Sequence, residues 1–140
     1  MKILKSQLKK LIKESTEEQV PRLNKVDGYF RCENNNLTSL QGAPKYVGGS
    51  FYCNDNKLTS LQGAPKYVDG NFWCDNNNLT SLQYAPKYVG SDFNCANNNL
   101  ESLQYAPKYV GGNFWCDNNT KQFTKEEVRA VCNVKGNIYV

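Results

Sequence analysis

Residues 50–70 read SFYCNDNKLTSLQGAPKYVDG, and the segments on both sides of them repeat this pattern. Residues 29–49 read YFRCENNNLTSLQGAPKYVGG, residues 71–91 read NFWCDNNNLTSLQYAPKYVGS and residues 92–112 read DFNCANNNLESLQYAPKYVGG. A fifth copy begins at residue 113 with NFWCDNN and then departs from the pattern. A fixed period of 21 residues indicates a repeat architecture, in which one copy cannot bury its own apolar face and neighbouring copies must stack.

The positions that stay the same in every copy indicate what each coil of such a stack requires. Phe and Cys stand two residues apart, so on a short strand both side chains face the interior. Two Leu and a Val in each copy add to this interior face. An Asn follows the strand, and its side-chain amide can bond the backbone of its own or an adjacent coil. This predicted structural ladder comprises Asn35, Asn56, Asn77, Asn98 and Asn119.

The pattern F-x-C-x-x-N-x-L-x-x-L-x-x-A-P-x-x-V, over about residues 26–119, resembles the leucine-rich repeat. Phe and Cys stand where that family often has Leu. The resemblance implies an α+β solenoid with short parallel β-strands on its concave face. Few residues follow Leu40 and its equivalents before the next copy begins, so we expect extended, irregular or 3₁₀ backs in place of full helices.

Three stretches are similar to leucine-rich-repeat proteins encoded by tailed bacteriophages, especially those of marine hosts. They are KSQLKKLIKE (5–14), LTSLQGAPKYVGGSFYC (37–53) and FTKEEVRAVCNVKGNIYV (123–140). This resemblance implies a protein of the bacterial host cytoplasm or of the virion. It does not imply a defined activity.

Three segments are expected along the chain: residues 1–25, residues 26–119 and residues 120–140. The first is basic, with Leu side chains at helical spacing, and is predicted to form an amphipathic helix. That helix either covers the first coil of the solenoid or docks on a partner. The second segment is the solenoid, and the third is a C-terminal cap.

Within the C-terminal cap, the sequence predicts a helix followed by a strand. Thr124 and Glu127 form a T-x-x-E capping box before an expected helix at residues 125–132. Residues 137–140 then repeat the Phe-x-Cys pattern as Ile-x-Val, which predicts a final strand. The open edge of this strand could pair with another copy of the protein.

The residue between Phe and Cys points away from the interior and changes from copy to copy. We call this column the aromatic stripe: Arg31, Tyr52, Trp73, Asn94, Trp115 and Tyr139. Glu33 and Asp75 are expected beside it. Because Trp and Tyr dominate interface energetics, the stripe predicts a binding face for an unidentified protein of host or phage. The same rings could instead stack on sugars, or only support the sheet by packing on one another. A third alternative is a structural virion protein that assembles through the C-terminal edge or the N-terminal helix.

Charge and composition argue against several other functions. Residues 1–26 carry seven Lys or Arg and three Glu, whereas residues 27–140 carry ten basic and ten acidic groups. A neutral solenoid does not favour nucleic-acid binding. The chain contains no His, and no phosphate loop or nucleophile motif is recognisable. We therefore expect no enzyme, and predict no catalytic residue, metal or cofactor.

The six cysteines are interpreted as free thiols. Five of them recur every 21 residues, a spacing unlike the close pairs of zinc sites, and they alternate with Phe as core residues do. No apolar run is long enough to cross a membrane. No signal peptide is recognisable at the N-terminus, so secretion by that route is not expected.

Overall fold

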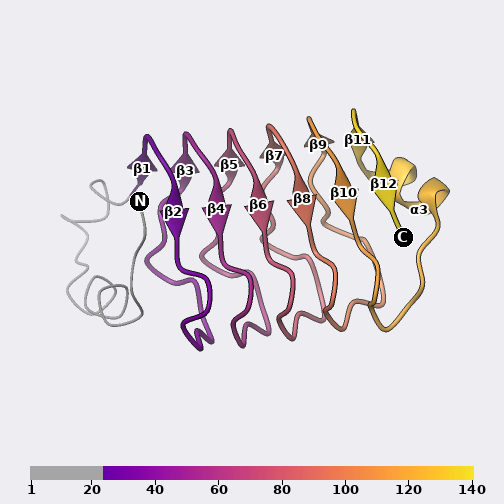
Figure 1. The fold of residues 1–140 in the computed structure, drawn as a ribbon, viewed down its shortest axis with the longest axis horizontal. Coiled ribbons are helices and arrows are strands. Elements are labelled where there is room, and N and C mark those ends of the chain that lie inside the picture. Colours follow the sequence, from indigo (N-terminus) through magenta and orange to yellow (C-terminus); the bar gives the residue numbers. More distant parts are fainter. Residues whose placement is uncertain (1–23) are drawn as a thin grey trace.

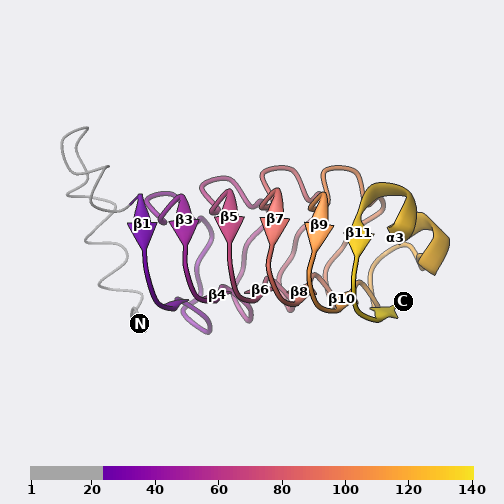
Figure 2. The ribbon, with the colours of Figure 1, turned by 90° about the horizontal axis from the view of Figure 1, so that it is seen from above.

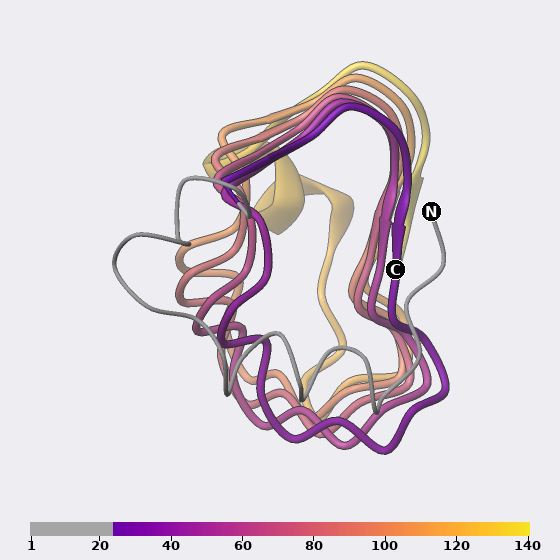
Figure 3. The same ribbon diagram turned by 90° about the vertical axis from the view of Figure 1, so that its left-hand side faces the viewer.

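The protein is described by a computed structural model of residues 24–140. In it the chain winds into a solenoid whose coils are about 21 residues long. The predicted N-terminal helix falls within residues 1–23 and lies outside the described residues. Figures 1 and 2 show the coils side by side in a nearly straight row, and Figure 3 shows them superposed around one interior.

Two parallel sheets of six strands each run along the row. The first, which we call the Phe sheet, has the order β12-β10-β8-β6-β4-β2. Its strands are β2 (Phe30–Arg31), β4 (Phe51–Tyr52), β6 (Phe72–Trp73), β8 (Phe93–Asn94), β10 (Phe114–Trp115) and β12 (Ile138–Tyr139). The register is that of the repeat, so Phe51 pairs with Phe72 and Tyr52 with Trp73.

The second sheet, which we call the Tyr sheet, has the order β1-β3-β5-β7-β9-β11. Its strands are β1 (Lys25–Val26), β3 (Tyr46–Val47), β5 (Tyr67–Val68), β7 (Tyr88–Val89), β9 (Tyr109–Val110) and β11 (Asn133–Val134). Sequence analysis did not predict this sheet, and the expectation of irregular or 3₁₀ backs was wrong on this point. A two-residue strand is too short to show alternation, so it can be recognised only when neighbouring coils pair.

The interior is filled by the same side chains in every coil. Phe51, Phe72, Cys53 and Cys74 are completely buried. Rings of the Phe column stack on the ring of the next coil, with centroids 5.2 Å apart for Phe30 and Phe51 and 5.4 Å apart for Phe51 and Phe72. Because each coil buries its apolar face only against the next one, stability comes from the stack as a whole.

The Asn column binds consecutive coils together through its side-chain amides. The Asn56 Oδ1 accepts from the backbone N–H groups of Asn35 and Leu37, both at 2.9 Å. Its Nδ2 donates to the carbonyls of Cys32 at 3.1 Å and Cys53 at 3.0 Å. Asn77, Asn98 and Asn119 repeat the bonds to the two Cys carbonyls. The side chain thus pairs backbone groups that would otherwise be buried without partners.

Close approach of the coils also explains a recurring Gly. A Cβ atom on Gly49 would lie 2.8 Å from the carbonyl carbon of Gly28, and one on Gly70 would lie 2.8 Å from that of Gly49. A Cβ at Gly49 or Gly70 therefore requires a local shift of the two coils, and Ser91 shows that one copy accommodates a side chain at the equivalent position.

A helix and a strand follow the last complete coil. Helix α3 (Lys125–Val131) begins after Thr124, whose side chain accepts from the backbone N–H of Glu127 at 3.2 Å. Val128 projects from this helix into the core and is fully buried. Figure 1 shows α3 beyond β11 and β12, at the C-terminal end of the row. The helix thereby covers part of the interior that the end of a stack exposes.

Candidate functional site

The aromatic stripe lies on the outward face of the Phe sheet. Phe and Cys take the inward positions of each strand, so the residue between them must face the other way. Arg31 and Tyr139 are exposed, whereas the two Trp, Tyr52 and Asn94 are only half-buried. The sequence-based description of the stripe as an exposed column therefore holds only for its two ends.

Neighbouring side chains of the stripe cover one another in two groups. The Tyr52 and Trp73 rings meet edge to face with centroids 5.0 Å apart, and the guanidinium of Arg31 lies 4.9 Å from the Tyr52 centroid. At the other end, Trp115 and Tyr139 stack with centroids 4.9 Å apart and planes 10° from parallel. Such contacts keep the rings in place before any ligand arrives, which lowers the entropic cost of binding.

An acidic row runs beside the stripe, two residues further along each strand. It comprises Glu33, Asn54, Asp75, Ala96 and Asp117. Among the described residues, the buried side-chain polar atoms without a hydrogen-bond partner all lie in this row or in the stripe. They are Glu33 Oε2, Asn54 Oδ1, Trp73 Nε1, Asp75 Oδ1 and Asp117 Oδ1. Unpaired buried polar atoms are costly and rare in folded proteins, so their concentration on one face requires an explanation.

The electrostatics of the acidic row differ between coils. In the first coil Glu33 forms a salt bridge with Arg31, with 3.0 Å between Nη2 and Oε1. Within residues 24–140, no Lys or Arg forms a salt bridge with Asp75. Burial raises the pKa of the Asp75 carboxyl to about 6, and the nearby Asp55 carboxylate adds to the rise while a backbone hydrogen bond opposes it. Asp75 is therefore a carboxylate that its surroundings destabilise.

The row on the other side of the stripe has a structural role that sequence analysis did not detect. The row comprises Ser50, Asn71, Asp92 and Asn113, and each of their side-chain oxygens accepts from the backbone N–H of the equivalent residue in the next coil. Ser50 Oγ accepts from Asn71 at 2.9 Å, Asn71 Oδ1 from Asp92 at 3.0 Å and Asp92 Oδ1 from Asn113 at 2.8 Å. This row contains only Ser, Asn and Asp, which are short side chains with an acceptor oxygen. That restriction in residue type was the sequence signal for the structural role.

All six cysteines are buried and free, as the sequence predicts. Burial raises the pKa of the Cys32, Cys116 and Cys132 thiols to about 12. The thiol of Cys74 donates to the carbonyl of Asn94 with 3.3 Å between Sγ and the oxygen. A protonated, hydrogen-bonded thiol is a poor nucleophile and a poor metal ligand. Within residues 24–140, no three acidic, Cys or His side chains are placed to hold a metal ion.

The outward face of the Tyr sheet carries the lysines and tyrosines of the PKYV segments. Lys45, Lys66, Lys87 and Lys108 are exposed on its border. Tyr88 and Tyr109 stack with ring centroids 5.1 Å apart, and the hydroxyl of Tyr46 donates to Asp69. No buried polar side-chain atom on this face lacks a partner in the described part of the chain.

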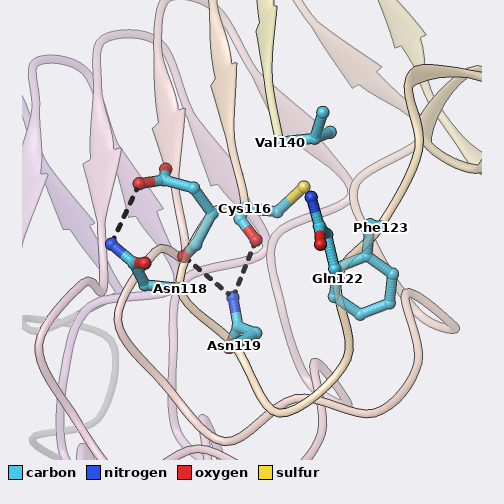
Figure 4. Close-up of a pocket in the computed structure, with 7 residues that line it drawn as sticks. Cys116, Asn118, Asn119, Gln122, Phe123 and Val140 are labelled. Carbon is cyan, nitrogen blue, oxygen red and sulfur yellow. Dashed lines mark hydrogen bonds between the residues drawn. The ribbon is translucent and has the colours of Figure 1, made fainter.

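Two of the hollows at the C-terminal end of the solenoid border the Phe sheet. Figure 4 shows the first, about 300 Å³, with Asn119 donating to the Cys116 carbonyl on one side and Phe123 on the other. The second is an open groove of about 440 Å³ beside the stacked pair Trp115 and Tyr139, with Lys125 on its border. Asp117 lines both hollows, while its Oδ1 atom is buried.

Comparison of the chain with protein-family models, with curated proteins and with solved structures finds no match. The fold itself defines the class of the protein, which is a parallel β-solenoid with coils of about 21 residues. Among residues 24–140 there is no helix of the length and apolarity that crossing a membrane requires.

Proposed function

We propose that this solenoid is a non-catalytic binding module that holds a protein partner on the aromatic stripe. The observation that carries the proposal is the concentration of unpaired buried polar atoms on this face, next to half-buried Trp and Tyr rings. Trp and Tyr rings bordered by polar groups match the composition of protein interfaces, in which a few aromatic residues near the centre supply most of the binding energy. A partner toward which these side chains turn would remove the cost by supplying donors to the four oxygens and an acceptor to Trp73 Nε1.

Variation in residue type between coils also supports the aromatic stripe as the binding face. In the four complete copies every inward column keeps its residue type, and the outward Tyr of the PKYV segments is the same in all four. The stripe, in contrast, changes from Arg to Tyr, Trp and Asn. A solenoid needs identical residues where coils stack, so variation on one face provides the chemical detail that recognition requires.

We also propose a finer classification of the fold as a leucine-rich-repeat protein of bacteriophage origin, acting in the host cytoplasm or in the virion. The support is the spacing of Phe, Cys, Asn and Leu within each copy and the similarity of the two terminal stretches described above. Self-association through β12, which is an edge strand of the Phe sheet, stays a prediction.

The test compares three immobilised proteins in a capture experiment from bacterial lysate. They are the wild type, a Trp73→Ala, Trp115→Ala variant, and a matched Tyr67→Ala, Tyr88→Ala variant of the Tyr sheet. We expect a partner that the wild type and the Tyr-sheet variant retain and the Trp variant loses, provided that all three unfold at similar temperatures. Equal capture by all three would place the binding site elsewhere.

A carbohydrate ligand is a second candidate because of the groove beside Trp115 and Tyr139. The Tyr139 side chain is 41% exposed, and the polar groups of Asp117 and Lys125 border the same groove. Stacking of a ring on an aromatic side chain together with polar contacts is a common form of small-ligand binding. Tyr139→Ala should abolish retention on immobilised glycans if this candidate is correct.

A further inference from the structure

The aromatic stripe is interrupted in its fourth coil, where Asn94 stands between the two tryptophans. Asn94 pairs in register with Trp73 of β6 on one side and with Trp115 of β10 on the other. Neighbouring strands lie about 4.8 Å apart, so the backbones of the two Trp are about 10 Å apart. We call this interruption the tryptophan gap.

Each tryptophan has an aromatic neighbour only on the side away from the gap. Tyr52 contacts Trp73 from the preceding coil, and Tyr139 contacts Trp115 from the following strand. Between them, the short side chain of Asn94 is folded toward its own strand, because its Oδ1 accepts from the backbone N–H of Ala96 at 3.0 Å.

The width of the gap suits one flat group. Ring contacts elsewhere in this stripe have centroid distances of 4.9 and 5.0 Å. Two such ring contacts in series span about 10 Å. The backbones of strands two places apart in a sheet have about the same separation. A single planar group above Asn94 could therefore contact both indoles at the distances this protein already uses.

The charges around the gap favour a cationic group. Asp75 and Asp117 lie on the same face as the tryptophans, two residues further along their strands. Among the described residues, the Oδ1 atom of each carboxylate has no hydrogen-bond partner. Ala96 stands at the corresponding position of the fourth coil, and the carboxylate beside Asn94 on its own strand is that of Asp92, whose Oδ1 accepts from the backbone N–H of Asn113.

The first two coils contain an intramolecular example of the same chemistry. The Nε and Nη2 atoms of Arg31 lie 3.1 and 3.0 Å from Oε1 of Glu33. The same guanidinium lies over the ring of Tyr52, 4.9 Å from its centroid. In these columns a guanidinium can thus contact a ring of the stripe and a carboxylate of the acidic row simultaneously. Guanidinium groups stack on aromatic faces and bind carboxylates with directed N–H donors, whereas an ammonium group lacks the flat surface.

We propose that the tryptophan gap binds the guanidinium of an arginine side chain presented by the partner protein. The group stacks between Trp73 and Trp115 and pairs with the carboxylates of Asp75 and Asp117, whose side chains turn toward it. This inference rests on the proposed protein-binding function and specifies the chemistry of the partner.

Intrinsic fluorescence provides a direct test, because the chain contains only two Trp and both border the gap. The probe is the capped tripeptide acetyl-Gly-Arg-Gly-amide, titrated into the full-length protein. The matched probe contains citrulline, which has nearly the same shape as arginine but no charge. We expect a saturable fluorescence change with arginine and an affinity at least about tenfold lower with citrulline, because the charge contributes to both stacking and hydrogen bonding.

Two variants locate the binding. Asn94→Tyr places a third ring in the gap, and because the stripe already contains Tyr52 and Tyr139 this change is compatible with the fold. Asp75→Asn combined with Asp117→Asn retains the shape and removes the charge. Both should reduce the affinity for the arginine probe at least about tenfold, whereas Tyr67→Ala on the Tyr sheet should not. Thermal unfolding checks that each variant is folded.

Three results would overturn the inference: no saturable response to arginine, equal responses to arginine and citrulline, or full binding by the folded Asn94→Tyr variant. The capture experiment distinguishes these results from failure of the proposed function. If the Trp variant loses its partner while the arginine probe does not bind, the stripe is the binding face and a group other than arginine occupies the gap.

Discussion

The two sheets of this solenoid contain strands of equal length and share one interior, yet their outward faces differ. On the Tyr sheet, the outward residue is Tyr in the four PKYV copies, and Tyr67 is 50% exposed. On the Phe sheet, the outward residue changes between coils, the Trp side chains are half-buried, and buried polar atoms lack partners.

This difference separates what the coil requires from what a particular surface provides. On each of the two sheets, the inward residue stays the same from one complete copy to the next, because every coil must match its neighbour. Nothing in the stack requires Trp73 or Asp75, because other coils fold with Asn94 and Ala96 at the same positions. Residues that the fold does not require, and that carry an energetic cost, are the strongest candidates for function.

The largest expected effect comes from breaking the ladder on which both faces depend. Asn77→Ala removes the acceptor of the Leu58 N–H and the donor to the Cys53 and Cys74 carbonyls. Leaving these buried groups unpaired should lower the free energy of unfolding by about 3 kcal/mol. Denaturant titration followed by circular dichroism measures the change.

The matched control for the ladder is Asn78→Lys, because Lys57 occupies the same position one coil earlier. Its free energy of unfolding should stay within about 0.5 kcal/mol of the wild type. Equal destabilisation by the two substitutions would show that the Asn77 side chain is not specifically required.

The second prediction compares the two outward faces directly. Trp73→Ala removes a half-buried ring that packs on Tyr52, and should lower the free energy of unfolding by about 1–2 kcal/mol. Tyr67→Ala removes an exposed ring of the Tyr sheet and should cost less than about 0.5 kcal/mol. If thermal unfolding shows the two variants to be equally stable, the packing difference between the faces is not energetically significant.

The third prediction concerns the pH dependence of the Phe-sheet face. The pKa of Asp75 is about 6 in the folded protein and about 3.9 in an unfolded chain. The folded state therefore binds more protons between these values, and the contribution of Asp75 to stability falls as the pH rises from about 4 to 6. Since the carboxyl is partly exposed, solvent screening limits the effect to less than about 1 kcal/mol.

Asp75→Asn removes this titration. The free energy of unfolding of the variant should therefore increase relative to that of the wild type between pH 4 and pH 8. Urea unfolding at the two pH values measures it, and the other acidic groups cancel in the comparison. A difference that does not depend on pH would mean that the Asp75 carboxylate is solvated.

The smallest effect is expected at a turn that precedes the Tyr sheet. Tyr84 adopts a φ of 71°, whereas Gly42 and Gly63 take the same turn position in the first two coils. Tyr84→Gly relieves the left-handed strain but adds backbone freedom to the unfolded chain, so a net gain of about 0.5 kcal/mol is expected. A lower melting temperature for this variant would instead indicate that the Tyr84 ring makes a stabilising contact.

The sequence alone determined the coil length, the inward columns and the capping helix. Each of these features repeats or has a local chemical signal. The period is visible in five copies, the Cys column alternates with Phe and is buried as free thiols, and Thr124 is followed by Glu127 at the spacing of a capping box. The predicted direction of the aromatic stripe follows from the same alternation, whereas the N-terminal segment lies outside the described residues.

Only the tertiary structure decided the features that depend on neighbours 21 residues away in the chain. The Tyr sheet consists of two-residue strands, whose pairing exists only after the coils have stacked. The ladder through Asn71 and Asp92, the raised pKa of Asp75 and the approach of each Trp to a Tyr likewise depend on contacts between coils. A sequence pattern specifies which way a side chain points, but its burial and hydrogen-bond partners are properties of the assembled stack.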